Sequence, residues 1–310
     1  MIEARVGAPL SGRRSRMTLP ADSNSQDLVR LGLPKGRMQA GLFQLLGDAG
    51  INVHVDQRGY RPTISLDGFE TKILKPQNVV EMLHAGSRDL GFAGADWVAE
   101  LDADLVEVLD TALDPVQVVA AAPRTLLIDG KLPSQHLVIA SEYKRLTTDW
   151  ITRRNLDASF VRSYGATEVF PPEDADCIVD NTATGSTLRA NGLDIVEIVM
   201  RSSTRLFANP SALENPTKKA RIDHVVMLLK SVLEARARVI IEVNVSAADL
   251  EALIEILPCM RHPTIAPLHG ETGFAIKAAV PKRDLPTLIP KLRERGGSDI
   301  LVMRPSQIVP

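Results

Sequence analysis

The chain has 310 residues, 45% hydrophobic and 24% charged side chains, and a net charge of −2, as is typical of a globular protein. The near-neutral charge gives no reason to expect nucleic-acid binding, and no apolar run reaches the ~18 residues that a membrane-spanning helix needs. The two cysteines, Cys177 and Cys259, fit neither a metal motif nor a disulfide framework, so we expect a cytoplasmic location.

Residues 1–27 differ from the rest of the chain in composition. They lack apolar periodicity and are rich in Arg, Ser, Gly and Pro. An arginine-rich start suggests a transit peptide, but such peptides are poor in acids, whereas this segment contains Glu3, Asp22 and Asp27. We therefore expect a disordered N-terminal extension.

From residue 28 onward, strand and helix patterns alternate. We expect short strands over residues 28–34, 51–55, 63–66, 71–75, 89–94, 116–123, 137–141, 158–164 and 176–180. We expect helices over residues 36–50, 76–86, 95–101 and 145–155, and a further helix that begins at residue 187. This alternation predicts an α/β fold with parallel sheets and helices on both faces.

The longest helical pattern runs through residues 214–239 and leads to a unit of different character. That unit reads as strand, helix, strand, strand, helix and strand, which is the ferredoxin-like order. The predicted division is therefore a first lobe from residues 28–122 and 203–216, a second lobe from 124–202, a linking helix over 217–238, and a ferredoxin-like domain over 239–310.

The stretch CIVDNTATGSTLRANG, residues 177–192, joins an apolar strand to a helix through a loop rich in hydroxyl groups. Gly185 allows close backbone approach, and Ser186 or Thr187 is placed to cap the helix. Free N–H groups at a helix start suit a phosphate, and the carboxylate of Asp180 suits a sugar diol. The stretch favours a ribose 5-phosphate site, with a plain turn and cap as the alternative.

This loop resembles the phosphoribosyl-pyrophosphate (PRPP) loop of phosphoribosyltransferases. Further segments, LGLPKGRM, DLGFAGAD and RHPTIAPLHGETGFAIKAAVPKRDL, follow the order found in the long form of the ATP phosphoribosyltransferase family, the first enzyme of histidine biosynthesis. The resemblance implies two lobes like those of type II periplasmic binding proteins and a C-terminal regulatory domain. It also implies transfer of the phosphoribosyl group of PRPP to N1 of ATP, with Mg²⁺ and release of pyrophosphate.

The resemblance also assigns roles to residues near the sugar. Asp180 would hold the ribose hydroxyls and act in catalysis, with Glu168 near the sugar. The 5-phosphate would be bound by Thr184, Gly185, Ser186 and Thr187. Asp176, before the strand, is either a structural carboxylate or a contact.

The nucleotide side is expected near the first strands. Lys35 and Arg37 form a cationic pair around Gly36 at a helix start, which suits phosphates and catalysis, although two solvated charges are the alternative. The resemblance adds Gly36, Lys75, Gly91 and Gly94 to the nucleotide site. Asp96 is placed either to cap the next helix or to touch the ligand.

In the C-terminal unit the resemblance implies a site for L-histidine as a feedback inhibitor, at Thr264 with Asn244 and Leu268. A plain surface strand is the alternative. The family forms homo-oligomers, from dimers to hexamers. The sequence assigns no residues to the Mg²⁺ ion.

Three segments depart from the family pattern, and all are expected on the nucleotide and pyrophosphate side. They are residues 75–78 with Lys75 and Asn78, 111–118 with Asp114, and 140–145, where Glu142 replaces a cation before Lys144 and Arg145. These changes keep two alternatives open: a non-catalytic relative that senses a phosphoribosyl ligand, and an enzyme with another nucleophile. A salvage-type phosphoribosyltransferase is disfavoured because the first 100 residues and the C-terminal segment match the histidine enzyme.

Overall fold

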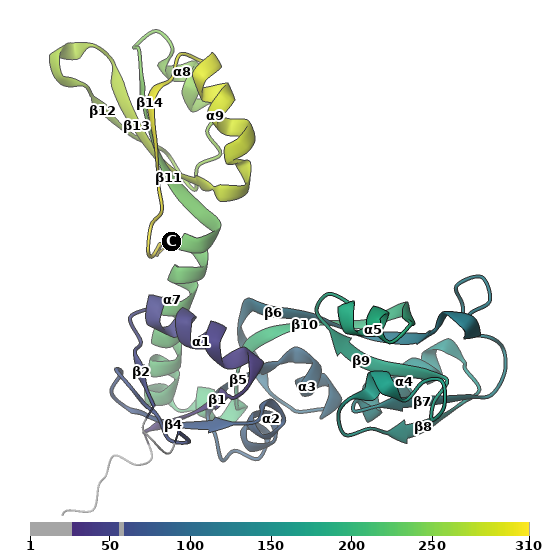
Figure 1. The fold of residues 1–310 in the computed structure, drawn as a ribbon. Coiled ribbons are helices and arrows are strands. Elements are labelled where there is room, and N and C mark those ends of the chain that lie inside the picture. Colours follow the sequence, from purple (N-terminus) through teal and green to yellow (C-terminus); the bar gives the residue numbers. More distant parts are fainter. Residues whose placement is uncertain (1–26, 56–58, 310) are drawn as a thin grey trace, which may run out of the picture.

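A computed structural model describes residues 27–55 and 59–309. The N-terminal extension predicted over residues 1–27 lies almost entirely outside this part, so that prediction stays untested. The described chain forms two lobes side by side and a third unit that stands on a long helix (Figure 1). No helix in the described part is both long and apolar enough to cross a membrane.

The first lobe contains the N-terminal strands and helices in the predicted order. Its elements are β1 (Val29–Pro34), α1 (Arg37–Asp48), β2 (Val53–His54), β3 (Thr63–Ile64), β4 (Phe69–Leu74), α2 (Pro76–His84), β5 (Leu90–Gly94) and α3 (Ala95–Glu100). The apolar strand β1 is central because it pairs in parallel with both β4 and β5. Proline at the first position of α2 starts that helix without the loss of a backbone hydrogen bond.

The second lobe repeats the alternation on a smaller scale. Its elements are β7 (Leu137–Ser141), α4 (Lys144–Arg154), β8 (Ala158–Arg162), β9 (Cys177–Thr182) and α5 (Ser186–Ala190), with single 3₁₀ turns at Arg124–Leu126 and Thr167–Val169. Strand β7 pairs in parallel with β8 and β9. Trp150 and Tyr143 are fully buried in the core of this lobe.

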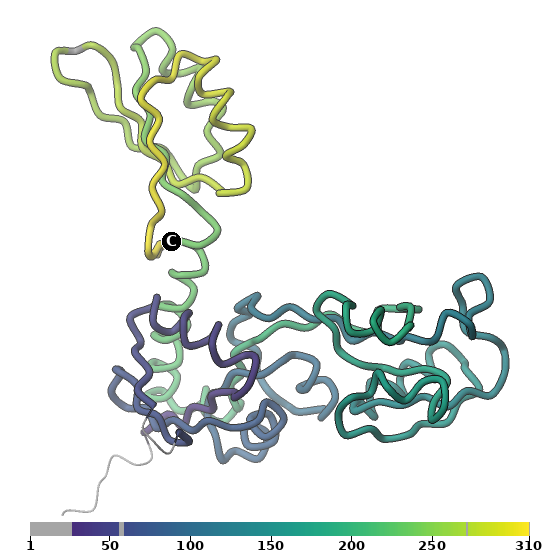
Figure 2. Tube along the Cα trace, viewed as in Figure 1, coloured from purple at the N-terminus to yellow at the C-terminus, as the bar shows by residue number. Residues whose placement is uncertain are grey.

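Two long strands, β6 (Val106–Pro123) and β10 (Leu193–Ala208), run through both lobes (Figure 2). They join the lobes into one eight-stranded sheet in the order β4-β1-β5-β10-β6-β9-β7-β8. Strand β10 is antiparallel to β5 and β6, and β6 is antiparallel to β9. The three strands of each lobe are parallel, as predicted, but the antiparallel β6 and β10 make the whole sheet mixed, so the prediction of parallel sheets holds only within each lobe. Strand β10 carries no clear alternation of apolar and polar residues, which explains why the sequence did not indicate it.

The long strands also move the expected lobe boundary. Residues 117–121 of β6 already pair with β9 of the second lobe, so the chain changes lobes before residue 122. At the crossing, Ala112 and Asp114 both have positive φ angles, 54° and 46°, and the β6–β10 register shifts between Ser202 and Thr204. The crossing is therefore irregular strand, not a loop.

The chain then returns to the first lobe through α6 (Pro210–Glu214) and α7 (Pro216–Ala237). The side chain of Asn215 caps α7 by accepting a hydrogen bond from the Lys218 backbone N–H at 3.1 Å. A buried ion pair fixes the helix further, since Lys218 Nζ lies 2.9 Å from Asp89, which also binds Arg30. Burial alone would raise the pKa of Asp89, but its bonds from Arg30 and Lys218 outweigh this and lower it.

The C-terminal unit has the predicted order of elements: β11 (Arg238–Val245), α8 (Leu250–Ile254), β12 (Thr264–Pro267), β13 (Phe274–Pro281), α9 (Leu285–Glu294) and β14 (Ser298–Met303), with 3₁₀ turns at His269–Glu271 and Lys282–Asp284. Its antiparallel sheet has the order β12-β13-β11-β14. Both helices cover one face, where Val243, Ile276 and Leu292 form the core. The other face carries Leu301 and Met303, which are 57% and 41% exposed.

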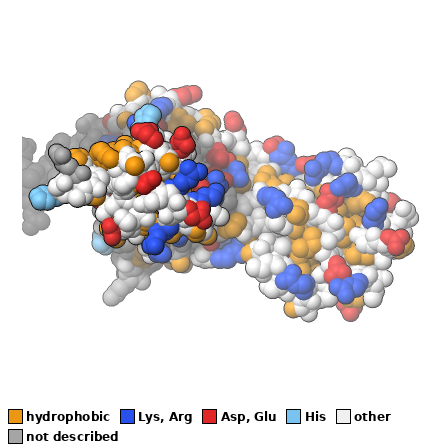
Figure 3. Space-filling model, turned by 90° about the horizontal axis from the view of Figure 1, so that it is seen from above, with side chains coloured by type: hydrophobic (Ala, Val, Ile, Leu, Met, Phe, Trp, Pro, Cys, Tyr) orange, Lys and Arg blue, Asp and Glu red, His pale blue; other side chains and the backbone are white. Residues whose placement is uncertain are grey.

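The last described residues lead back to the first lobe. The Ile308 N–H donates to the Ser231 carbonyl oxygen at 2.9 Å, and Arg236 in α7 pairs with Asp48 at the end of α1. Seen from above, the second lobe projects away from the C-terminal unit and is not covered by it (Figure 3). The loop after β9 therefore remains accessible.

Candidate active site

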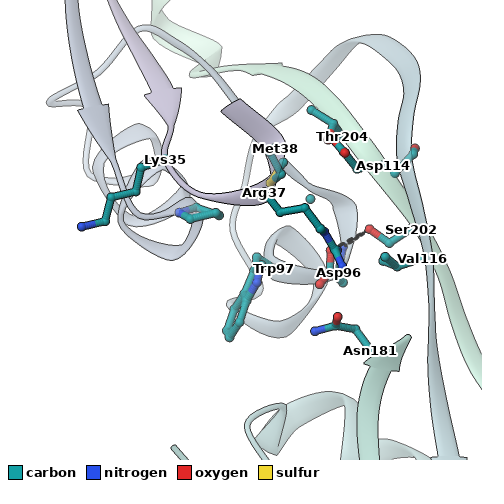
Figure 4. A pocket seen from close by; sticks show the side chains of 13 residues that line it. Lys35, Arg37, Met38, Asp96, Trp97, Asp114, Val116, Asn181, Ser202 and Thr204 are labelled. Atoms are coloured by element: carbon teal, nitrogen blue, oxygen red, sulfur yellow. Dashed lines mark hydrogen bonds between the residues drawn. The ribbon is translucent and has the colours of Figure 1, made fainter. Parts of the chain in front are cut away.

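Two cavities lie where the lobes meet. The first, of about 260 Å³, is built from the ends of β1 and β5 and from the crossing segments of β6 and β10 (Figure 4). It is lined by Lys35, Arg37, Met38, Pro76, Gly94, Asp96, Trp97, Asp114, Val116, Asn181, Ser202, Ser203 and Thr204. An aromatic ring, two carboxylates and the Arg37 guanidinium in one cavity are suited to a nucleotide.

The second cavity, of about 320 Å³, is more polar and belongs to the second lobe. It is lined by Arg37, Glu142, residues 165–168, residues 180–184 and residues 186–188. Loop hydroxyl groups form one wall, and the carboxylates of Asp180, Glu168 and Glu142 face the same space. This arrangement is suited to a ligand that brings both hydroxyl groups and a cation.

Within the loop after β9, hydrogen bonds fix the backbone. The Gly185 N–H donates to Thr182 Oγ1 at 2.9 Å, and Thr184 Oγ1 donates to Ser186 Oγ at 3.0 Å. Gly185 itself is the N-cap of α5, with φ 71°, so the expected cap by Ser186 or Thr187 is wrong. Because Ser186 and Thr187 do not cap the helix, their side chains line the cavity.

Asp180 is the most perturbed carboxyl group of the second cavity. Burial is the main reason that its pKa rises to about 6, and the nearby charges of Glu168 and Glu142 raise it further. The Asn181 N–H, which donates to Asp180 Oδ1 at 2.7 Å, only partly opposes the rise. A ligand hydroxyl or a cation in this cavity would stabilise the charged form.

The predicted cationic pair separates in space. Arg37 extends into the first cavity and also lines the second, whereas the amino group of Lys35 points away from the other labelled side chains (Figure 4). Gly36 between them has φ 85° and is the N-cap of α1. A glycine is required at this turn because other residues rarely adopt that angle.

The three other residues predicted near the nucleotide, Gly94, Gly91 and Lys75, lie in different surroundings. Gly94 lines the first cavity, and its missing side chain leaves room for the Asp96 carboxylate, which lies 2.2 Å from where a Cβ would stand. Gly91 lies inside buried β5, where Val79 of α2 occupies the space of a side chain, so this glycine serves packing. Lys75 caps α2 and lines neither cavity, although the next residue, Pro76, lines the first.

Asp96 is held by the protein itself. Ser202 Oγ donates to Asp96 Oδ1 at 2.6 Å, and the Tyr143 hydroxyl donates to Oδ2 at 2.7 Å. Asp96 is only 4% exposed and belongs to the first lobe, whereas Tyr143 is fully buried in the second and packs on Trp97 with ring centroids 4.8 Å apart. These contacts connect the two lobes at the base of the cleft.

Asp176 is structural, since its Oδ2 accepts a hydrogen bond from the Val138 N–H at 2.7 Å. Of the departing segments, Asp114 lies in the first cavity and accepts a hydrogen bond from Thr204 Oγ1 at 2.9 Å, and Glu142 lies in the second. Asn78 binds Glu81 on the surface, and Arg145 pairs with Asp102, so neither faces a cavity.

Several residues of the site were missed in the sequence. Asn181 directly follows Asp180 in the loop motif and could have been found by asking which neighbours of the motif face inward. Ser202 reaches the first cavity only through strand pairing, and the buried Tyr143 reaches Asp96 and Asn181 only through packing across the lobes, so no local pattern identifies them.

In the C-terminal unit, Thr264 lines a cavity of about 370 Å³ between β12, β13 and the returning residues 308–309. Asn244 and Leu268 do not line it. Asn244 Nδ2 donates instead to Asp299 at 3.1 Å. The three residues predicted for histidine are thus not gathered within one subunit.

Comparisons with known proteins agree on one family. The family model for ATP phosphoribosyltransferase (HisG) matches residues 75–231, and the model for its C-terminal domain matches residues 235–305. ATP phosphoribosyltransferase of Chlorobaculum parvum is 38% identical over 90% of this chain and 96% of its own length. That of Pelotomaculum thermopropionicum is 34% identical over 91% of this chain and 99% of its own length.

A solved structure supports the fold of the two lobes. It is a chain of the ATP phosphoribosyl transferase (HisG:HisZ) complex from Thermotoga maritima, with a TM-score of 0.58 and 21% sequence identity. The match covers 66% of this chain and 99% of that chain.

Proposed function

This chain belongs to the ATP phosphoribosyltransferase family, and from that premise we propose that its first cavity holds ATP and its second holds PRPP. The chain transfers the phosphoribosyl group of PRPP to N1 of ATP and releases pyrophosphate, the first step of histidine biosynthesis. The observation that carries the assignment is that the two cavities meet at Arg37 and Asn181. Two substrates that react with each other need such adjoining sites.

In the second cavity, the loop hydroxyls of Thr184, Ser186 and Thr187 bind the 5-phosphate. Asp180 accepts hydrogen bonds from the ribose hydroxyls, and Glu168 lies beside it. In the first cavity, Trp97 offers an apolar surface for the purine, while Arg37 attracts phosphates of either substrate from its shared position. Lys35 reaches the phosphates only by a change of rotamer, because its amino group points outward (Figure 4).

The reaction needs a restrained leaving group and an aligned nucleophile more than it needs a strong base, because displacement at C1 of the ribose passes through an oxocarbenium-like state. The lobes supply alignment, since each holds one substrate. We propose that they close on the substrates as lobes of type II periplasmic binding proteins do. Closure would bring N1 of the purine towards C1 and exclude water.

Magnesium would enter with PRPP. No group of three or more His, Cys, Asp or Glu side chains in the described residues is arranged to hold a metal ion. The pyrophosphate oxygens are therefore the main ligands in this proposal, with Asp180, Glu168 and Glu142 facing the ion. Burial, and after it the charges of Glu168 and Glu142, raise the pKa of Asp180, and a nearby cation would favour its charged form. The ion would neutralise charge on the leaving pyrophosphate.

A mass-spectrometric assay tests the activity and the site together. The protein is incubated with ATP, PRPP and Mg²⁺, and each component is omitted in turn. We expect N1-(5-phosphoribosyl)-ATP and pyrophosphate only in the complete mixture. Binding of PRPP without product would instead favour the non-catalytic alternative, for which the acidic residues Asp114 and Glu142 in the cavities are the motivating observation.

We further propose that the C-terminal unit binds L-histidine as an inhibitor and takes part in homo-oligomer assembly. Support comes from the cavity at Thr264, and from the exposed Leu301 and Met303 on the sheet face without helices. The pocket would be completed by a neighbouring subunit, which would explain why Asn244 and Leu268 lie apart from Thr264. The returning residues 307–308 connect this unit to α7 and α1, and so provide a route to the cleft.

Inhibition by L-histidine and light scattering of the intact protein test this proposal. We expect an oligomer, a higher melting temperature with L-histidine, and weaker inhibition in Thr264→Val than in Thr287→Val, which changes a surface threonine elsewhere in the same unit. A monomer that L-histidine neither stabilises nor inhibits would overturn it.

A further inference from the structure

Asn181 occupies a position that no role described so far explains. In the part of the chain that the structure describes, only Asn181 and Arg37 line both cavities. Asn181 lies in β9 directly after Asp180, so its backbone is fixed by pairing with β6. A side chain at this junction stands where the two substrates must meet.

The hydrogen bonds around Tyr143 determine which way the Asn181 amide faces. The Asp96 carboxylate can only accept hydrogen bonds, so the Tyr143 hydroxyl must donate its single proton to Asp96 Oδ2, 2.7 Å away. The Tyr143 oxygen is then free only to accept. The group of Asn181 that lies 2.9 Å from it must therefore be the NH₂ group, as the structure has it.

This orientation leaves the other end of the amide open. No residue in the described ranges donates to Asn181 Oδ1, and that oxygen is not among the fully buried polar atoms that lack a partner. The side chain points into the first cavity, beside Asp96 and Trp97 (Figure 4). The network thus presents a fixed hydrogen-bond acceptor at the junction of the cavities.

The network is rigid because each of its members is either buried or held by two hydrogen bonds. Tyr143 is fully buried, it packs on Trp97, and burial with the Asp96 charge holds its pKa far above the ordinary value, so the phenol keeps its proton. Asp96 receives a second bond from Ser202 Oγ at 2.6 Å. Rotation of the Asn181 amide would place its oxygen against the lone pairs of Tyr143, which would be repulsive.

We propose that Asn181 Oδ1 accepts a hydrogen bond from the C6 amino group of the purine and so selects and orients the nucleophile. This inference rests on the proposed assignment of ATP to the first cavity and PRPP to the second. In the reaction, one bond forms between N1 and C1, and the bond from C1 to the pyrophosphate oxygen breaks, with the electron pair leaving on pyrophosphate.

Attack by N1 transfers positive charge to the purine ring, and conjugation shares this charge with the amino group at C6. The N–H bonds of that group become stronger donors as the new bond forms. An acceptor fixed at Asn181 is therefore bound more tightly in the transition state than in the ground state, which is the condition for rate enhancement. Tyr143 and Asp96 act through Asn181 and are positioning residues.

The test compares two nucleotides in two proteins. Purine riboside 5′-triphosphate keeps N1 but lacks the amino group, so it cannot donate to Asn181. For the wild type we measure kcat/KM with ATP and with this analogue, and then repeat both measurements with Asn181→Leu. We expect the preference for ATP to fall about tenfold in the variant. The lower nucleophilicity of the analogue cancels, because it affects both proteins equally.

Tyr143→Phe tests the positioning role. It removes the acceptor that holds the amide, so we expect part of the same loss of preference, whereas Tyr60→Phe, at a 63% exposed tyrosine that lines neither cavity, should change nothing. A merely structural role for Tyr143 would lower both rates and leave the preference intact. If Asn181→Leu has a much lower melting temperature than the wild type, Asn181→Ala is measured in the same way.

Unchanged preference for ATP in the Asn181 variants would overturn the inference, even if their activity is low. Failure of the proposed function looks different, because the wild type would then form no phosphoribosyl-ATP at all.

Discussion

The start of α4 in the second lobe is capped from the first lobe: the Arg145 backbone N–H donates to Glu100 Oε1 at 3.1 Å. The next N–H, of Leu146, donates to Oε2 of the same carboxylate at 3.0 Å. The helix has no side-chain cap of its own, because its N-cap is Tyr143. Glu100 thus satisfies two helix N–H groups and joins the lobes in one interaction.

We expect Glu100→Ala to lower the free energy of unfolding by about 1–2 kcal/mol, as loss of a helix cap does. Glu100→Gln should lower it less, since the amide keeps one acceptor. Denaturant unfolding of both variants measures this. Glu81→Ala, at an exposed glutamate of α2, is the control and should lie near the wild type. Equal stability of Glu100→Ala and the control would show that the cap contributes nothing.

Gly91→Ala tests the conclusion that this glycine serves packing and not the nucleotide. A Cβ there would stand 2.6 Å from Val79 Cγ1 in the core, so we expect a loss of about 1–3 kcal/mol in unfolding free energy. The KM for ATP should hardly change. Gly41→Ala in α1 is the matched control, because its Cβ would meet nothing within 4 Å and alanine favours a helix.

A stable Gly91→Ala protein with a raised KM for ATP would restore the original assignment of Gly91 to the nucleotide site.

Gly36, Gly185 and Gly91 show which glycine roles can be predicted from the sequence. Gly36 and Gly185 occur in turns with positive φ angles, and each is followed by a helical sequence pattern. Both were therefore predicted correctly at helix starts. Gly91 lies in a segment that reads equally well as a ligand loop or as a buried strand. Only the packing of α2 on β5 distinguishes the two.

The same limit applies to the fold. Local periodicity predicted most helices and strands, and the order of the C-terminal unit, because each is written in consecutive residues. The mixed sheet depends on β10, whose pairing with β5 and β6 joins segments about 100 residues apart. The site residues show the same contrast between local and long-range features. Asp180 lies in a local motif, whereas Ser202 and Tyr143 reach Asp96 only through the tertiary fold.

Asp180→Asn should stabilise the ligand-free protein in a pH-dependent way. The pKa of Asp180 is about 6 in the folded protein against an ordinary value of 3.8, so the folded state binds this proton more tightly than the unfolded state. The wild type therefore loses stability from this group as the pH rises from about 4 to 6. Above pH 6 we expect the variant to be more stable by about 1–3 kcal/mol, and below pH 4 the difference should vanish.

Thermal unfolding from about pH 3 to 8 checks this, with Asp174→Asn, an exposed carboxylate of the same lobe, as control. A constant difference across the range would show that Asp180 does not titrate as described. Activity of Asp180→Asn should fall above pH 6, because the sugar there loses the charged acceptor that the wild type offers.

Thr184→Ala and Asp180→Ala should weaken PRPP binding far more than ATP binding. Each removes a group of the second cavity only, and loss of a hydrogen bond to a charged partner costs roughly 1.5–3 kcal/mol. Calorimetry with each substrate measures the two affinities. Thr152→Ala, at an exposed threonine of α4, is the control. Equal losses for both substrates would remove the loop from the assigned role.

The two strands that run through both lobes have a consequence for how the chain folds as it leaves the ribosome. The core of the first lobe joins Leu31 and Phe92 to Leu206, Ile222 and Val232, which are made far later. The N-terminal residues must therefore wait for more than 100 further residues before their apolar faces are covered, and chains that pause during synthesis expose them. We infer that the first lobe, although made first, completes its folding only after the second lobe, and that nascent chains shorter than about 230 residues are those that chaperones protect.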